Sequence, residues 1–455
     1  MNTLSSKRRF SAQGKTLLLL IAAVSMAAVT PVAYLECQEQ RLTKFQRELA
    51  HTMTKLVLDD VKKNYYDPKY HGIDIEARFR QADDKIEQAS SFNQVFVAIQ
   101  WALDALNDSH THFVGPPRPT RSEYGWQMQM VGAQCLVTAV KAHSDAEKQG
   151  LHAGDAIVSL DNYAVGRDNI FALRGFFEDL IPQTSLNVTL RDPDGNKKVL
   201  TIQAEIQHRM RNMTTLGENV TDLNRIAYAW DLEHKSKAVV VGSDLMIWKM
   251  PEFFEEEEID RQVGQAKKYQ TFVLDLRGNP GGTFESLLRV VGGLFDHDVK
   301  VGQATSRKGS TSLVAKTRGD RAYKGKLIVL VDSDTASAAE IMARLVQIEK
   351  RGIVIGDRTA GAVIGAKFFQ HGSSPGNLQI VFYGAEVSTA DLVLSDGQRL
   401  EGVGVTPDEV LLPTPADLAG HRDPVLTHAA SSAGATLTPE AARGLIPITW
   451  ESVVE

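Results

Sequence analysis

The chain of 455 residues has little cysteine and no surplus of positive charge. Two cysteines, Cys37 and Cys135, exclude a disulfide framework; a single bridge is open to them, but we expect none because Cys37 lies beside the N-terminal segment. The net charge of −6, without basic clusters that interleave with aromatic residues, argues against nucleic acid as a partner. No spacing of Cys or His fits a metal site, so we expect neither a metal ion nor another cofactor.

The N-terminal segment has the layout of an export signal. Basic residues between Lys7 and Lys15 precede an apolar run over 17–29 that ends in small residues resembling a cleavage site. The apolar character continues to Leu35, so an uncleaved membrane anchor is the alternative. We therefore expect residues 1–35 to direct export, to the periplasm or beyond the cell, as a cleaved signal or an anchor.

Four regions follow this segment. The pattern over 36–120 is helical, with apolar residues at three- and four-residue steps along Leu42–Val61. Short β-like runs with glycine turns fill 121–206. Strand-like and helical runs alternate over 207–413, which predicts an α/β layer fold with parallel strands. Residues 414–455, rich in Ala, Pro and Thr, look like a loosely attached C-terminal tail.

The β-like region resembles a PDZ domain. A short helical run leads through the Gly154-Asp155 turn into a buried strand, and runs over 186–190 and 198–202 form a closing hairpin. PDZ domains hold an extended peptide by adding it to a sheet as a strand, so this region implies a polypeptide partner. The usual carboxylate-binding loop is not recognisable near Gly125, which argues against capture of a terminal carboxylate.

Ser337 stands where a strand-like run gives way to a helical one. The apolar run 328–331 stops at a polar turn, and the helical pattern starts directly after it. A serine at such a junction can hold its hydroxyl near free N–H groups at a helix start, which suits an acyl-transfer nucleophile. Ser337 and Glu340 also fit the Ser-x-x-Glu capping box, so a plain helix cap is the competing interpretation.

The glycines of 275–282 lie between a predicted strand and a predicted helix. Glycines at this place let backbone N–H groups approach a ligand, although a tight turn alone would need them too. No Lys-Ser or Lys-Thr follows them, which excludes a phosphate-binding loop and leaves an oxyanion hole as the functional interpretation.

A candidate base and a candidate acid lie far from Ser337 in sequence. His110 follows a helical pattern in a polar turn, and histidine titrates near neutrality, at a pKa of about 6.5, as the base for a serine nucleophile must. Glu401 lies between glycine turns; the commoner fate of a glutamate is a surface charge.

These four segments, in this order, resemble the carboxyl-terminal processing, or tail-specific, serine peptidases of family S41. The resemblance spans about 108–408, with the PDZ-like region at its expected place. It implies a crotonase-like or ClpP-like α/β superhelical core, export from the cell, and unfolded or short polypeptides as substrates. A non-catalytic peptide- or ligand-binding envelope protein on the same fold is the alternative.

The family has two branches that differ in the base. One uses a lysine directly after a Gly-x-x-Thr-x-Gly turn; here that turn is Gly356–Gly361 and the next residue is Ala362, which cannot take a proton. Lys367, five residues on, is not assigned a role. The tricorn-like branch uses a Ser-His pair, a serine nucleophile and a glutamate. The matching residues are Ser109, His110, Ser337 and Glu401.

The resemblance gives each matched residue an expected role. His110 would take the proton of Ser337 as it attacks the scissile carbonyl, then return it to the leaving amine. Ser109 and Glu401 would orient the imidazole. The expected oxyanion-hole donors are the backbone N–H groups of Ala338 and of Gly281 or Gly282.

Overall fold

The computed structural model describes residues 42–118, 120–191, 195–208, 236–373 and 381–446. The predicted export segment, 1–35, lies outside the described residues. No helix in the described ranges is long and apolar enough to cross a membrane.

Three helices open the described chain: α1 (Lys44–Asn64), α2 (Ile75–Glu87) and α3 (Phe92–Leu103). Each begins at a side-chain cap, supplied by Thr43, Asp74 and Ser91. The predicted apolar face of α1 is largely confirmed, since Met53 and Val61 are buried against the neighbouring helices together with Ala50 and Val57. Phe45 is the exception, because it is 53% exposed.

The predicted parallel sheet forms the centre of the peptidase-like region, in the order β10-β11-β12-β15-β16-β19. Only the edge pair β10–β11 is antiparallel. The strands are β10 (Lys237–Val241), β11 (Leu245–Lys249), β12 (Thr271–Asp275), β15 (Lys326–Val331), β16 (Gly352–Gly356) and β19 (Glu409–Val410). Both faces are covered, so the central strands β12 and β15 are buried almost throughout and mostly apolar, as parallel strands usually are.

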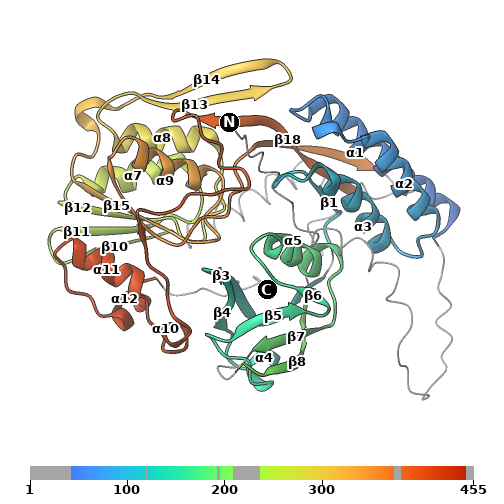
Figure 1. Ribbon diagram of the computed structural model, residues 1–455, viewed down its shortest axis with the longest axis horizontal. Coiled ribbons are helices and arrows are strands. Elements are labelled where there is room, and N and C mark those ends of the chain that lie inside the picture. Colours follow the sequence, from blue (N-terminus) through green and yellow to red (C-terminus); the bar gives the residue numbers. More distant parts are fainter. Residues whose placement is uncertain (1–41, 119, 192–194, 209–235, 374–380, 447–455) are drawn as a thin grey trace, which may run out of the picture.

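Helices lie on both faces of this sheet (Figure 1). One face carries α7 (Glu256–Ala266), α8 (Phe284–Leu294) and α9 (Ala338–Ile348). The other carries the C-terminal helices α11 (Pro424–Ser432) and α12 (Pro439–Leu445), which follow α10 (Pro415–Ala419). The prediction of a loosely attached tail is therefore wrong for the described residues 414–446, because Leu426 and Ala429 are buried against Ile328 and Leu330.

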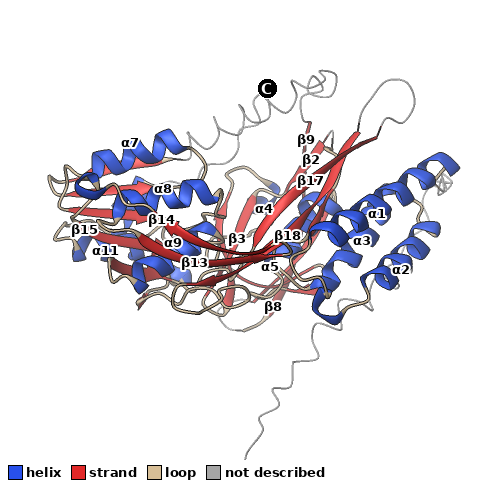
Figure 2. Ribbon diagram, turned by 90° about the horizontal axis from the view of Figure 1, so that it is seen from above, coloured by secondary structure: helices blue, strands red, loops and turns tan. Residues whose placement is uncertain are grey.

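A second, mainly antiparallel sheet joins the N-terminal helices to this core, and the sequence did not predict it. Its strands are β1 (His112–Val114), β13 (Val299–Ser306), β14 (Gly309–Ala315), β17 (Gly365–Ser373) and β18 (Val381–Leu394). The long strand β18 pairs with β1, β13 and β17, and it runs from the helices to the core (Figure 2). Its Tyr383 packs among the N-terminal helices, whereas its Leu392 belongs to the main core.

The predicted β module has a core of its own. Its strands are β3 (Trp126–Val131), β4 (Gln134–Val140), β5 (Ala156–Leu160), β6 (Tyr163–Ala164), β7 (Ser185–Arg191) and β8 (Lys197–Gln203), with helices α4 (Asp145–Lys148) and α5 (Ile170–Gly175). The ribbon of β2 (Thr120–Glu123) and β9 (Glu205–His208) forms its stem. The predicted closing hairpin is β7–β8. Cys135 is free and buried in β4, and Cys37 lies outside the described residues.

Candidate active site

Ser337 occupies a strained turn between β15 and α9. Its φ of 53° and ψ of −120° differ from the extended conformation of ordinary cap residues, such as Thr283 of α8 with φ −73° and ψ 146°. A non-glycine residue in this region persists only where its surroundings hold it. Here the Ser337 N–H donates to the carbonyl of Ala362 at 2.9 Å, and the next residue back, Ala336, donates to Asn279 at 2.8 Å. The conformation therefore distinguishes Ser337 from a simple helix cap.

The glycine turn after β12 lies directly against Ser337. A Cβ placed on Gly281 would lie 2.5 Å from the Ser337 Cβ and 3.0 Å from the Ala338 nitrogen, so only glycine fits there. The Gly281 N–H is already bound to Asn279 Oδ1 at 2.8 Å. Of the two expected glycine donors, Gly281 therefore has its N–H occupied, and Gly282 lies against the backbone of Phe253.

A second group of side chains forms a hydrogen-bonded chain across 292 sequence positions. The Ser109 hydroxyl lies 2.9 Å from Glu401 Oε2 and 2.7 Å from His110 Nδ1. The Ser109 N–H also donates to Glu401 Oε1, at 2.8 Å. An ionised Glu401 can only accept, so the hydroxyl donates to it and accepts from the Nδ1–H of His110. This assignment leaves Nε2 of His110 unprotonated, as a general base requires.

Asp108 fixes the backbone of this polar turn, and the sequence analysis missed its role. Its carboxylate accepts the N–H of His110 at 3.1 Å and that of Thr111 at 2.7 Å. It also accepts the Ser388 hydroxyl of β18 at 2.8 Å. The turn is therefore tied to the strand that joins the two halves of the molecule. The signal available in the sequence was an Asx residue directly before the Ser-His pair, a type that stabilises turns through its own side chain.

Burial governs the protonation of the candidate base and acid. It lowers the pKa of His110 to about 4, since His112 adds to the decrease and Asp108 offsets only part of it. His110 is therefore neutral at pH 7 and able to accept a proton. Burial also raises the pKa of Glu401, while the donors from Ser109 and Val363 act in the opposite direction.

One loop connects Ser337 with the Glu401 chain. Ala362 accepts the Ser337 N–H, and the N–H of the next residue, Val363, donates to Glu401 Oε2 at 2.7 Å. Within the described residues there is no hydrogen bond between His110 and Ser337, a contact that often tightens only when substrate binds. Lys367 is exposed on β17. In the same ranges, no group of three or more His, Cys, Asp or Glu side chains could hold a metal ion.

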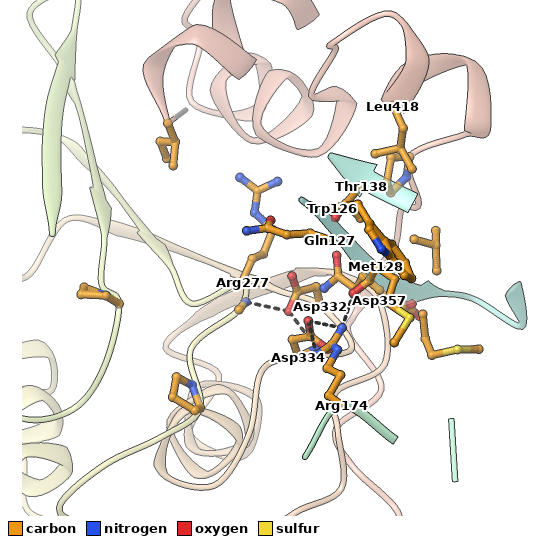
Figure 3. A pocket seen from close by; sticks show the side chains of 18 of the residues that line it. Trp126, Gln127, Met128, Thr138, Arg174, Arg277, Asp332, Asp334, Asp357 and Leu418 are labelled. Atoms are coloured by element: carbon orange, nitrogen blue, oxygen red, sulfur yellow. Dashed lines mark hydrogen bonds and ion pairs between the residues drawn. The ribbon is translucent and has the colours of Figure 1, made fainter. Parts of the chain in front are cut away.

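A cavity of about 1080 Å³ separates the β module from the core and extends to Pro280, beside the glycine turn. Figure 3 shows Arg174, Asp332, Asp334 and Asp357 close together at its wall, next to the β3 residues Trp126, Gln127 and Met128. Strand β3 has β4 on one side only.

Side chains cover the free edge of β3 in this structure. The carbonyl of Met128 accepts from Arg174, which also pairs with Asp334 at 3.1 Å. The carbonyl of Met130 accepts the Ser333 hydroxyl at 2.6 Å. Hydrogen bonds thus link the β module to Asp334 and Ser333, which lie three and four residues before Ser337 in the chain.

Comparisons with known proteins give these residues a context. Residues 246–411 match the model described as Peptidase family S41. The chain is 22% identical over 376 residues to carboxyl-terminal-processing peptidase 3, chloroplastic, of Arabidopsis thaliana, covering 76% of this chain and 69% of that protein. It is 25% identical over 389 residues to the C-terminal processing peptidase, chloroplastic, of Tetradesmus obliquus, covering 79% and 77%. The structure of mature CPAF aligns with a TM-score of 0.58 and 14% identity over 81% of this chain and 94% of that one, which shows a shared mixed α/β fold.

Proposed function

We propose that this chain, a serine peptidase of family S41 as its motifs predicted, cuts unfolded or short polypeptides with Ser337 as nucleophile and His110 as base. The observation that carries this proposal is the chain from Glu401 through Ser109 to His110 Nδ1, which leaves Nε2 as the proton acceptor. Ala362 supports the same branch, because its methyl group cannot replace a lysine base.

The proposed reaction runs through an acyl-enzyme. Ser337 Oγ attacks the scissile carbonyl carbon while its proton passes to Nε2 of His110. The carbonyl oxygen becomes an oxyanion held by the N–H groups of Ala338 and Gly282. When the intermediate collapses, the C–N bond breaks and His110 returns the proton to the leaving amine. Water, deprotonated by the same imidazole, then hydrolyses the ester.

Substrate binding has to bring His110 and Ser337 together. Ser109 stabilises the imidazolium that forms, because its hydroxyl oxygen accepts the Nδ1–H while Glu401 supplies the negative charge behind it. The adjacent residues Ala362 and Val363 contact both partners, since Ala362 accepts the Ser337 N–H and the Val363 N–H donates to Glu401.

We also propose that the core is crotonase-like or ClpP-like and that the β module is a PDZ-like module that holds substrate along β3. The cavity beside β3 and α5 supports the second, because it leads from a strand edge to the glycine turn near Ser337. A peptide added to β3 has to displace Arg174 and Ser333 from the carbonyls that they occupy. Export remains a proposal that rests on residues 1–35.

The test is peptide release from an unfolded protein and a mixed peptide library, followed by mass spectrometry. The chain without residues 1–35 is compared with its Ser337→Ala and His110→Ala variants, and Lys367→Ala is the control. We expect cleavage to vanish in the first two variants and to persist in the control. Survival of cleavage in His110→Ala would show that the base is wrong. A folded parent that binds peptides without cleaving them would favour a non-catalytic binding protein.

A further inference from the structure

Glu340 is a fully buried carboxylate in the first turn of α9, and it lies between the two halves of the proposed site. Four donors converge on it. Oε2 accepts the N–H of Ser337 at 3.1 Å and that of Ala362 at 2.8 Å. Oε1 accepts the Thr359 hydroxyl at 2.5 Å and the N–H of Gly361 at 2.8 Å.

This arrangement exceeds what a helix cap needs. A capping glutamate has to accept only the N–H of its own cap residue, here Ser337, and it normally does so at the surface. The other three donors of Glu340 come from the loop 359–362, outside the helix. Burying a carboxylate is costly unless its lone pairs are satisfied, and all four contacts here are with donors. Glu340 therefore does more than cap α9, because three further donors from another segment bind its carboxylate.

The donors of Glu340 lead to both halves of the proposed site. Ala362 accepts the Ser337 N–H, and its neighbour Val363 holds Glu401 Oε2. Along a second route, the Thr359 hydroxyl that donates to Glu340 also accepts the N–H of Val405, at 2.6 Å.

A third hydrogen bond links the loop that carries Glu401 to the 359–362 loop and its neighbour Val363. The N–H of Gly402 donates to the carbonyl of Gly361 at 2.7 Å. A shift of the 359–362 loop relative to α9 would therefore move Glu401, and with it Ser109 and His110, away from Ser337.

We propose that Glu340 is a positioning residue that fixes Ser337 and the Glu401–Ser109–His110 chain relative to each other by holding the 359–362 loop against the start of α9. The inference rests on the proposed function, because it assumes that Ser337 and His110 act together. Glu340 touches neither substrate nor the reacting atoms; it acts through the backbone of Ser337 and through Thr359, Gly361 and Ala362. Burial raises the pKa of Glu340 to about 7, against the effect of its four donors.

The principal test replaces Glu340 by glutamine. The side chain keeps its size, but its NH₂ group cannot accept the N–H groups of Ser337 and Ala362 in one orientation or that of Gly361 in the other, so at least one of the four contacts is lost whichever way the amide turns. We expect kcat on a peptide substrate to fall about 10²-fold, while KM stays within about twofold of the parent value. This pattern is expected when the reacting groups are misplaced but substrate still binds. The rate of Ser337 labelling by a fluorophosphonate should fall in parallel, since the nucleophile and base are then misaligned.

Glu258 supplies a matched control. It also lies in the first turn of a core helix, α7, and accepts from Ser236 at 2.9 Å and from Gln262 at 2.8 Å, but it has no contact with the site. Glu258→Gln should lower the melting temperature without changing kcat. If Glu340→Gln keeps the parental kcat and labelling rate, or changes them no more than Glu258→Gln does, the inference is overturned.

A second pair of variants keeps the inference testable if Glu340→Gln does not fold. Thr359→Val removes the donor to Glu340 and the acceptor for Val405, whereas Thr359→Ser retains both. We expect kcat to fall about tenfold in the valine variant and to recover in the serine variant. Equal kcat values in the two variants would overturn the inference. Failure of the proposed function looks different, because the parent itself would then neither cleave peptide nor take up the label.

Discussion

The backbone N–H of Ser337 donates to the carbonyl of Ala362, at 2.9 Å. Ala362, at the position where the other branch of the family has its lysine base, is thus in direct contact with the backbone of the proposed nucleophile, but it carries only a methyl group. The same loop then turns to hold Glu401 through Val363. Ala362 cannot supply a base by its side chain, but its backbone and that of Val363 connect the proposed nucleophile with the proposed acid.

Ser109 and Glu401 should act as one unit. Ser109→Ala and Glu401→Gln each break the chain that orients His110, so each should lower kcat/KM, by about 10- to 100-fold. The double variant should be little worse than the poorer single one, because residues acting in one chain are not additive. Steady-state kinetics of the four proteins measures this. Additive losses would mean that Ser109 and Glu401 act separately.

The pH dependence of kcat/KM should have two steps on its acid side. As pH falls below about 7, Glu340 gains a proton and the loop it holds loosens, which gives a partial loss. As pH falls towards about 4, His110 becomes protonated and can no longer accept the Ser337 proton, which gives a complete loss. Glu340→Gln should abolish the upper step and keep the lower one. A single step near 6.5 in the parent would contradict the lowered pKa of His110.

Gly281 should not tolerate a side chain, because it lies directly against Ser337. Gly281→Ala places a Cβ 2.5 Å from that of Ser337 at a φ of 107°, so the turn around the nucleophile has to move. We expect a loss of more than about 10²-fold in kcat. Gly278→Ala is the control, since its φ is 66° but nothing lies within 4 Å of the added Cβ. It should cost about 1 kcal/mol in unfolding free energy and leave kcat unchanged.

Arg174 should oppose peptide binding along β3. Arg174→Met keeps the apolar stem of the side chain but frees the Met128 carbonyl and breaks the pair with Asp334. In a Ser337→Ala background, fluorescence anisotropy of a labelled unfolded peptide should show several-fold tighter binding to the Arg174→Met variant. Weaker binding would mean that Arg174 itself holds the peptide.

Asp275 should make the core sensitive to strong acid. Burial alone would raise its pKa, but Arg277 and Lys249 hold the pKa at about 2. Because this value lies below the unfolded value of about 3.8, the stabilisation is complete above pH 4 and is lost as pH falls from about 4 to 2. Urea unfolding at a series of pH values should show this decline in the parent. The Asp275→Asn variant should have a lower free energy of unfolding at pH 7, and this free energy should change less with pH below pH 4.

The elements that were predicted correctly from the sequence share a local cause. The alternation of strands and helices over 237–356, and the β7–β8 hairpin, follow from hydrophobic period and turn residues within a few positions of each other. The junction at Ser337 was visible for the same reason. The C-terminal helices were missed because they are short and rich in alanine, so their order depends on the sheet face they cover.

The order of the motifs, the family and the identity of the candidate residues were thus determined by the sequence alone, because each depends on neighbours along the chain. Tertiary structure decided which of them meet. The contact of Ser109 with Glu401 spans 292 positions and depends on the pairing of β1 with β18, which no local pattern encodes. The burial of Glu340 is of the same kind, since only the packed 359–362 loop turns a cap-like glutamate into a carboxylate with four donors.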